Sequence, residues 1–178
     1  MRTEPRQVLI RGAEARDEAR VRAALERSMA GVARCAPPPR LLFEHFGPTG
    51  FVAESNGEVV GFLLGFVSQT YPGEACIHAV WVRPDRRRAQ LGTALYECFV
   101  AAAHEQYCSV VRAWAAGTDG GAIAFHQALG FVVDDEDQHL GGPLSDADRE
   151  AGESYVNFVR LVSGPSMAHP RPERESAA

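Results

Sequence analysis

Apolar positions along the chain follow two periods, one typical of strands and one of helices. Runs rich in β-branched and aromatic residues, which favour extended strands, recur seven times. They occupy residues 7–11, 51–54, 59–68, 76–82, 110–115, 131–133 and 155–162. Apolar residues at the helical period predict helices over residues 15–29, from residue 91 for about four turns, and over 119–129. This order predicts an α/β (α+β) fold in which helices flank a mixed sheet.

Two turn signals separate the predicted strands. Asn56-Gly57 lies between two of them, and both residue types tolerate the positive φ that a two-residue hairpin turn requires. We therefore expect the flanking strands to pair in antiparallel. Tyr71-Pro72-Gly73 marks a second turn, and the strand that follows it leads into a basic segment.

The length of 178 residues suits one domain around a single core. We expect that domain to span residues 6–163. From residue 164 the chain is rich in prolines, charges and small residues, which predicts a disordered tail over 164–178.

The composition narrows the function classes. With 46% hydrophobic and 23% charged residues the chain is typical of a soluble protein, and no apolar run approaches the roughly 18 residues of a membrane span. The N-terminus lacks the apolar core of a signal peptide, so we expect a cytoplasmic location. The net charge of −5 argues against a nucleic-acid partner. The four cysteines lack metal-type spacing and are expected to be reduced, and no metal site is predicted.

The segment of residues 80–95 carries the clearest functional signal. A β-branched strand runs through the three consecutive arginines Arg86, Arg87 and Arg88 into an amphipathic helix. Backbone N–H groups at a helix start have no partner within the helix, and the helix dipole adds partial positive charge there. The segment therefore predicts a phosphate-binding site.

Two motifs in the chain resemble those of the GNAT superfamily of N-acetyltransferases. The first is Arg87-Arg88-Ala89-Gln90-Leu91-Gly92, which resembles the family's cofactor motif. The second is the stretch over residues 119–131, which ends in Leu-Gly-Phe like the family's second signature. The resemblance covers roughly residues 6–163. It implies the GNAT fold, a twisted and mostly antiparallel sheet of about six to seven strands, and acetyl-CoA as cosubstrate.

The resemblance also implies a set of cofactor-binding residues. Backbone amides of residues 88–93 would hold the pyrophosphate of CoA, and main-chain groups of residues 80–82 would meet the pantetheine and the acetyl carbonyl. The full set is Val80, Trp81, Val82, Arg87, Arg88, Ala89, Gln90, Leu91, Gly92, Thr93, Asp119, Phe125 and His126.

Two positions depart from the family pattern. Gln90 stands where the family has glycine; either it takes an ordinary helical φ, which we expect, or its β-carbon weakens cofactor binding. Asp119 stands where the family has an asparagine near the cofactor, and a helix N-cap is its expected role.

Acetyl transfer to an amine also needs groups that move protons. Glu74 and His78 are candidate bases, because strict alternation along the strand would place them on the same face as Val80. His126 stands where the family often has tyrosine, and it is either the acid that protonates the CoA thiolate or only a cofactor contact. Cys76 on the same strand could form an acyl-enzyme, but direct transfer needs none.

We therefore expect an N-acetyltransferase that moves an acetyl group from acetyl-CoA directly to a primary amine in a ternary complex. The acceptor is a small molecule, an amino acid or a protein N-terminus. The acidic residues 134–137 form either a solvated loop or a surface that attracts a cationic acceptor. The alternative function is a non-catalytic acyl-CoA sensor or interaction module on the same fold. No nucleic-acid or membrane partner is expected, and a homodimer stays open.

Overall fold

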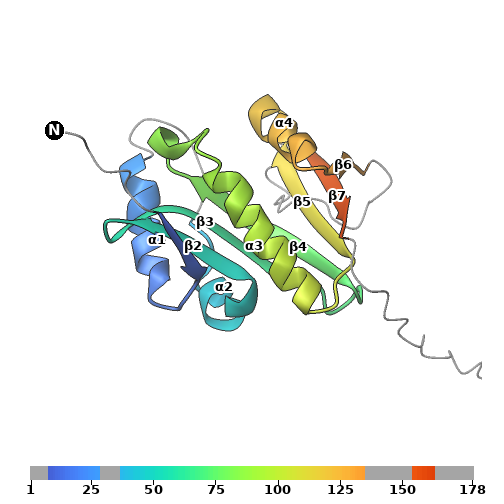
Figure 1. The fold of residues 1–178 in the computed structure, drawn as a ribbon, viewed down its shortest axis with the longest axis horizontal. Coiled ribbons are helices and arrows are strands. Elements are labelled where there is room, and N and C mark those ends of the chain that lie inside the picture. The colour runs from blue at the N-terminus through green and yellow to red at the C-terminus, as the bar shows by residue number, and fades with distance from the viewer. Residues whose placement is uncertain (1–7, 29–36, 135–153, 163–178) are drawn as a thin grey trace, which may run out of the picture.

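The computed structural model describes residues 8–28, 37–134 and 154–162. Seven strands form one sheet in the order β1-β2-β3-β4-β5-β7-β6 (Figure 1). Their bounds are β1 Leu9–Gly12, β2 Gly50–Ser55, β3 Glu58–Val67, β4 Glu74–Val82, β5 Val110–Ala116, β6 Val132–Val133 and β7 Tyr155–Leu161. All neighbouring strands are antiparallel except β4 and β5, which are parallel. The predicted fold class is confirmed.

Helices cover both faces of this sheet. Helix α3 (Leu91–Glu105) packs on β2, β3 and β4 and α4 (Gly120–Ala128) on β5, whereas α1 (Asp17–Ser28) and α2 (Arg40–His45) pack on β3 from the other side (Figure 1). The short helices η1 (Gly47–Thr49) and η2 (Pro84–Arg86) lie in connections. Helix α2 was not predicted from the sequence, because six residues are too few to show a helical period. None of the described helices is long and apolar enough to cross a bilayer.

The hairpin between β2 and β3 confirms the predicted turn. Asn56 has φ 53° and Gly57 has φ 76°, so both take the left-handed conformation. That conformation matches the twist of the flanking strands, and residues of β2 and β3 pair on both sides of it.

Two apolar clusters sandwich the sheet. The cluster under α3 contains the fully buried side chains Leu63, Leu95, Tyr96, Phe99 and Phe158. The cluster under α1 and α2 contains Val21, Phe43, Val52, Phe62 and Leu64. Burying these side chains stabilises the fold by about 1.5–3 kcal/mol each before chain entropy is subtracted. The cysteines Cys76 and Cys108 are also buried.

Strand β4 contains a bulge that changes which side chains share a face. Leu64 pairs with Ala79 but its neighbour Gly65 pairs with Ile77, so His78 is an extra residue in β4. One extra residue reverses the alternation of side chains along a strand.

The prediction that Glu74 shares a face with Val80 is therefore wrong. Val80 packs against the cluster under α3, and so do Ala75 and Ile77. Glu74, next to Ala75, consequently points to the opposite face. The bulge at His78 is the reason, because strict alternation would have kept the even-numbered residues together.

Strands β4 and β5 separate along their length. The ladder between them joins Glu74–Cys76 of β4 to Val110–Arg112 of β5, although β4 continues to Val82 and β5 to Ala116. Beyond this ladder β5 stays paired with β7 over its whole length. The carboxyl-terminal half of β4 thus has an open edge, with α3 on one side and α4 on the other.

Several sequence expectations fall outside the described residues. They concern the start of the first strand at Gln7, the helix end at Met29, Cys35, the acidic residues 135–137 and the tail over 164–178.

Candidate active site

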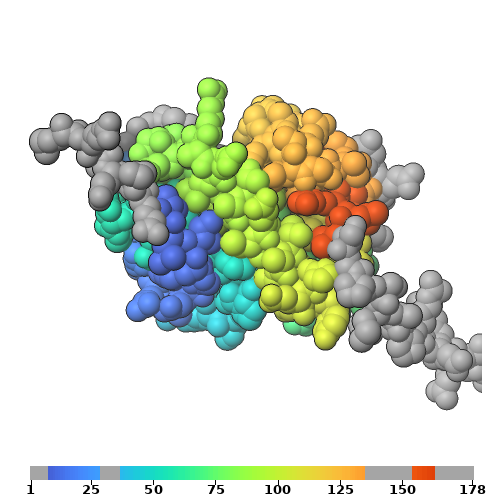
Figure 2. All heavy atoms as spheres, in the orientation of Figure 1, coloured from blue at the N-terminus to red at the C-terminus, as the bar shows by residue number. Residues whose placement is uncertain are grey.

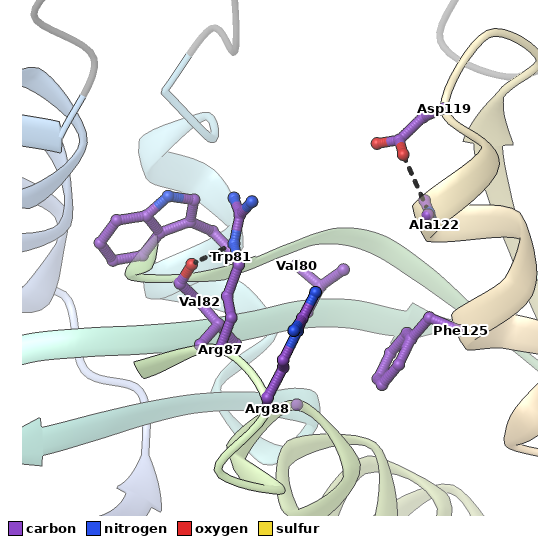
Figure 3. Close-up of a pocket in the computed structure, with 10 residues that line it drawn as sticks. Val80, Trp81, Val82, Arg87, Arg88, Asp119, Ala122 and Phe125 are labelled. Atoms are coloured by element: carbon purple, nitrogen blue, oxygen red, sulfur yellow. Dashed lines mark hydrogen bonds between the residues drawn. The ribbon is translucent and has the colours of Figure 1, made fainter. Parts of the chain in front are cut away.

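A cavity of about 460 Å³ opens where β4 ends and α3 and α4 begin (Figure 3). In the space-filling view the green surface of α3 lies beside the orange surface of α4 (Figure 2). The cavity lies at the separation of β4 from β5. The lining residues are Val80, Trp81, Val82, Arg87, Arg88, Gly92, Asp119, Gly121, Ala122 and Phe125. Most residues expected to bind the cofactor thus meet in one cavity. Gly121 and Ala122 also line the cavity but were not among the expected residues; the sequence signal that could have identified them is their position just after the predicted N-cap Asp119.

The remaining residues of the expected set lie elsewhere. Ala89 and Gln90 are exposed on the turn before α3, and Thr93 is partly buried in the first turn of that helix. Leu91 points into the core, and His126 is also buried. These side chains do not line the cavity, although the turn that carries Ala89 and Gln90 borders it.

The turn from β4 into α3 contains two residues in the left-handed conformation. Arg88 has φ 64° and Gln90, at the N-cap of α3, has φ 57° and ψ 6°. The expectation of an ordinary helical φ at Gln90 is therefore wrong. The chain must turn sharply between the strand and the helix, and glycine takes this backbone conformation with less strain than glutamine.

The two helices that border the cavity begin differently. The first turn of α3 has no side-chain cap, and its first helical bond is donated by the amide of Ala94 to the carbonyl of Gln90 at 2.9 Å. In α4 the Asp119 carboxylate accepts a hydrogen bond from the Ala122 amide at 2.9 Å (Figure 3). The expected N-cap role of Asp119 is confirmed. The first turn of α3 therefore has no side-chain acceptor that competes with an anion for its amides, whereas the Ala122 amide of α4 is already bonded.

Two arginines lie beside this helix start. The guanidinium of Arg87 donates from Nε to the carbonyl of Val82 at 3.3 Å, which ties the turn to the end of β4 (Figure 3). Arg88 is exposed and extends along the cavity, and among the described residues it has no carboxylate partner. Arg83, in contrast, pairs with Asp85 and does not line the cavity. Arg88 is therefore a cation available to a phosphate group.

Gly92 and Phe125 close the wall between the two helices. A β-carbon on Gly92 would lie 3.0 Å from Cζ of Phe125, which is tighter than ordinary contact. The ring of Phe125 also contacts Tyr96 of α3, edge to face, with ring centroids 5.4 Å apart. The two predicted motifs therefore meet through a glycine and an aromatic ring.

His126 lies in the core behind that wall and is 3% exposed. Its Nδ1 is 2.8 Å from the carbonyl oxygen of Ala122, and its Nε2 is 2.8 Å from the hydroxyl of Tyr96. Burial lowers the pKa of His126 below its ordinary value, despite opposing effects of the Ala122 carbonyl and Asp119. The ring is thus neutral at neutral pH.

The two candidate bases on β4 have different surroundings. His78, at the bulge, is partly buried, and its ring meets Trp114 edge to face with centroids 6.0 Å apart. Burial lowers the pKa of His78. Glu74 accepts hydrogen bonds from Arg112, the shorter one at 2.7 Å, and Arg112 also binds Asp134 at 2.8 Å. His78 is therefore neutral and able to accept a proton, whereas Glu74 is held in an ion-pair cluster.

The donor set of the cavity suits an anionic ligand with an extended apolar arm. It combines uncapped amides, an arginine without a carboxylate partner and an open strand edge, all beside apolar side chains. Within the described ranges, no group of three or more His, Cys, Asp or Glu side chains could hold a metal ion.

Comparison with known proteins agrees with this geometry. The sequence model of the acetyltransferase (GNAT) family matches residues 18–131. An uncharacterised N-acetyltransferase of Methanocaldococcus jannaschii is 35% identical over 85 residues, which cover 46% of this chain and 38% of that protein. The matched region thus spans well under half the length of this curated relative.

Solved structures share the fold. Ard1 of Thermoplasma volcanium has a TM-score of 0.68 at 25% identity, covering 88% of this chain and 99% of its own. A diaminobutyrate acetyltransferase of Paenibacillus lautus, solved with L-2,4-diaminobutyric acid and coenzyme A, has a TM-score of 0.70 at 19% identity, covering 92% and 100%. The ribosomal-protein-S18-alanine N-acetyltransferase of Escherichia coli reaches 0.64 at 18% identity, covering 93% and 100%. With its family motifs, its fold and its cavity all in agreement, the chain belongs to the GNAT family of acetyltransferases.

Proposed function

We propose that this protein transfers an acetyl group from acetyl-CoA to a primary amine by direct attack in a ternary complex. The observation that carries the proposal is the uncapped start of α3, which lies beside Arg88 at the mouth of a cavity on the open edge of β4. A dianionic pyrophosphate would satisfy both the amides and the arginine.

The residues present fit acetyl-CoA. First-turn amides of α3 and the guanidinium of Arg88 would hold the pyrophosphate, while the open edge of β4 near Val80 would hydrogen-bond the pantetheine amides. Phe125 supplies an apolar wall. When bound, acetyl-CoA supplies an acyl group already activated as a thioester. A backbone N–H of residues 80–82 would stabilise negative charge on the carbonyl oxygen.

For the base we propose His78. An alkylammonium is a free amine in only about one molecule in several thousand at pH 7, so the acceptor must lose a proton. The neutral ring of His78 does not line the cavity assigned to acetyl-CoA, but it lies on β4 just beyond the ladder with β5, at the separation of the strands where we propose that the acceptor enters. Glu74 is the second candidate, but it would have to leave Arg112 to accept a proton.

We do not assign the acid that protonates the departing thiolate to His126. Both of its ring nitrogens are hydrogen-bonded inside the core, and its side chain does not line the cavity. The general-acid role predicted for His126 stays a hypothesis, which the variant His126→Gln tests.

A catalytically inactive acyl-CoA sensor is the alternative, favoured by the strained Gln90 at the motif position where the family has glycine. One experiment separates the two. Acetyl-CoA affinity is measured by calorimetry, and CoA release is followed with a panel of amines. The panel includes L-2,4-diaminobutyric acid and peptides with N-terminal alanine, the acceptors of two structural neighbours. Binding with amine-dependent release supports the enzyme, binding without release with any amine supports the sensor, and absence of binding contradicts both.

A further inference from the structure

Tyr96 and His126 form a buried polar pair that the proposed chemistry does not use. Tyr96 on α3 is 0% exposed and His126 on α4 is 3% exposed. Burial raises the pKa of Tyr96 and lowers the pKa of His126, so both are neutral. Buried polar groups are costly unless they are paired, and these two pair with each other at 2.8 Å.

The hydrogen-bond partners fix the direction of this pair. The Ala122 carbonyl can only accept, so Nδ1–H of His126 donates to it and Nε2 carries the lone pair. The hydroxyl of Tyr96 therefore donates to Nε2. The amide of Ala122 in turn donates to Asp119. Hydrogen bonds thus run from the middle of α3 to the N-cap of α4, which lines the cavity.

Ring contacts hold His126 in place from other directions. It stacks on Phe158 of β7 with centroids 4.7 Å apart and planes inclined by 8°. It also meets the edge of Phe131 at 5.6 Å. The residue before it, Phe125, lines the cavity and touches Gly92. A shift of His126 would therefore move the wall that Phe125 forms.

We propose that Tyr96 and His126 form a positioning link that fixes α4 against α3 and thereby sets the width of the acetyl-CoA pocket. This inference rests on the proposed function, because the pocket it shapes is the one assigned to acetyl-CoA. His126 acts through Phe125 and the Asp119 to Ala122 turn, and transfers no proton to or from a substrate.

Three variants test the link. In His126→Gln an amide oxygen can still accept the Tyr96 hydroxyl but cannot act as an acid near neutral pH, so the Kd for acetyl-CoA and kcat should both stay within about threefold of wild type. Tyr96→Phe and His126→Phe each remove the hydrogen bond. Both should raise the Kd at least about fivefold and change kcat at saturation much less.

Two further measurements separate positioning from general loss of stability. Val21→Ala opens a cavity in the cluster on the opposite side of the sheet, so it should lower Tm without changing the Kd. The double variant Tyr96→Phe/His126→Phe should raise the Kd about as much as either single change, because the link is already lost in each.

Each contrary outcome is specific. A fall of about a hundredfold in kcat of His126→Gln at unchanged Kd would make His126 the general acid. An unchanged Kd in both Phe variants, or an equal rise in Val21→Ala, would reduce the pair to core packing. If wild type does not bind acetyl-CoA, the proposed function fails, and amide hydrogen exchange then decides the link. If the amide hydrogens of α4 exchange faster in Tyr96→Phe than in Val21→Ala, the positioning link is supported. Equal exchange rates in the two variants would overturn it.

Discussion

Gly92 at the start of α3 lies against the ring of Phe125 on α4, where an added β-carbon would come within 3.0 Å of Cζ. This contact brings the two sequence motifs together and leaves the amides of α3 open toward the cavity. A larger side chain at residue 92 must displace this ring, which lines the cavity that we assign to the cofactor.

Gly92→Val should therefore raise the Kd for acetyl-CoA at least about tenfold while the protein still folds, because a large residue forced into a tight contact displaces its neighbour. Calorimetry measures the Kd. Gly120→Ala is the matched control, since a β-carbon there meets nothing within 4 Å. Equal Kd values in Gly92→Val and wild type would show that Phe125 does not border the bound cofactor.

Gln90→Gly should stabilise the protein. Gln90 has φ 57°, and glycine takes the left-handed conformation with about 1 kcal/mol less strain. The same change at Gln127, within helix α4, should instead lower the free energy of unfolding by about 1 kcal/mol. Urea unfolding of the two variants should give opposite signs. A loss of stability in both would contradict the left-handed turn. The Gln90 side chain does not line the cavity, so Gln90→Gly should leave the Kd for acetyl-CoA unchanged. A gain of about tenfold in affinity would instead favour the sensor alternative.

Asp17 should make stability depend on acid pH. Burial alone would raise the pKa of Asp17, but hydrogen bonds from Arg11, the Glu14 amide and Arg20 lower it overall. A lowered pKa in the folded state stabilises the protein above the unfolded pKa of about 4, and this contribution is lost as the pH falls further.

Asp17→Asn should accordingly lower the free energy of unfolding by about 2 kcal/mol at pH 7. The loss is no larger because Arg11 and Arg20 still pair with Glu54 and keep some contact with solvent. The difference from wild type should shrink as the pH drops below about 4. Urea unfolding across this range tests the prediction. A difference that is absent at pH 7, or constant down to pH 2, would contradict it.

His78→Gln should reduce turnover by about a hundredfold, in the range of general-base contributions. Because burial lowers the pKa of His78, its base form is complete at neutral pH, and wild-type kcat/KM should fall only when the pH drops below that lowered pKa. This acid limb should vanish in His78→Gln and persist in His45→Gln, whose site on α2 is exposed. An unchanged limb in His78→Gln would leave Glu74 as the remaining candidate on β4.

The cofactor turn could be predicted from sequence because its signals are local. Arginines, a helix start and Gly92 lie within a few residues, and Asp119 precedes its helix as an N-cap should. The bulge at His78 left no comparable signal, since it depends on pairing with Gly65 across the sheet. The separation of β4 from β5 likewise depends on where two distant strands stop pairing.

The role of His126 shows the same limit. The motif places it correctly after Phe125, but a sequence cannot tell which way a helix turns that residue. In the structure its ring is hydrogen-bonded in the core to the hydroxyl of Tyr96, which lies thirty positions earlier on another helix. Helix α2 went unpredicted for a different reason, because its six residues are too few to show a helical period.

Calorimetric titration of acetyl-CoA into wild type and Arg88→Glu at two salt concentrations tests the central claim most directly. Wild-type affinity should fall as salt rises, because a phosphate contact is screened. Arg88→Glu should raise the Kd at least about tenfold and flatten that dependence, whereas Arg16→Glu, on an exposed residue before α1, should do neither. Equal Kd values and equal salt dependence in Arg88→Glu and wild type would remove the turn between β4 and α3 from the cofactor site.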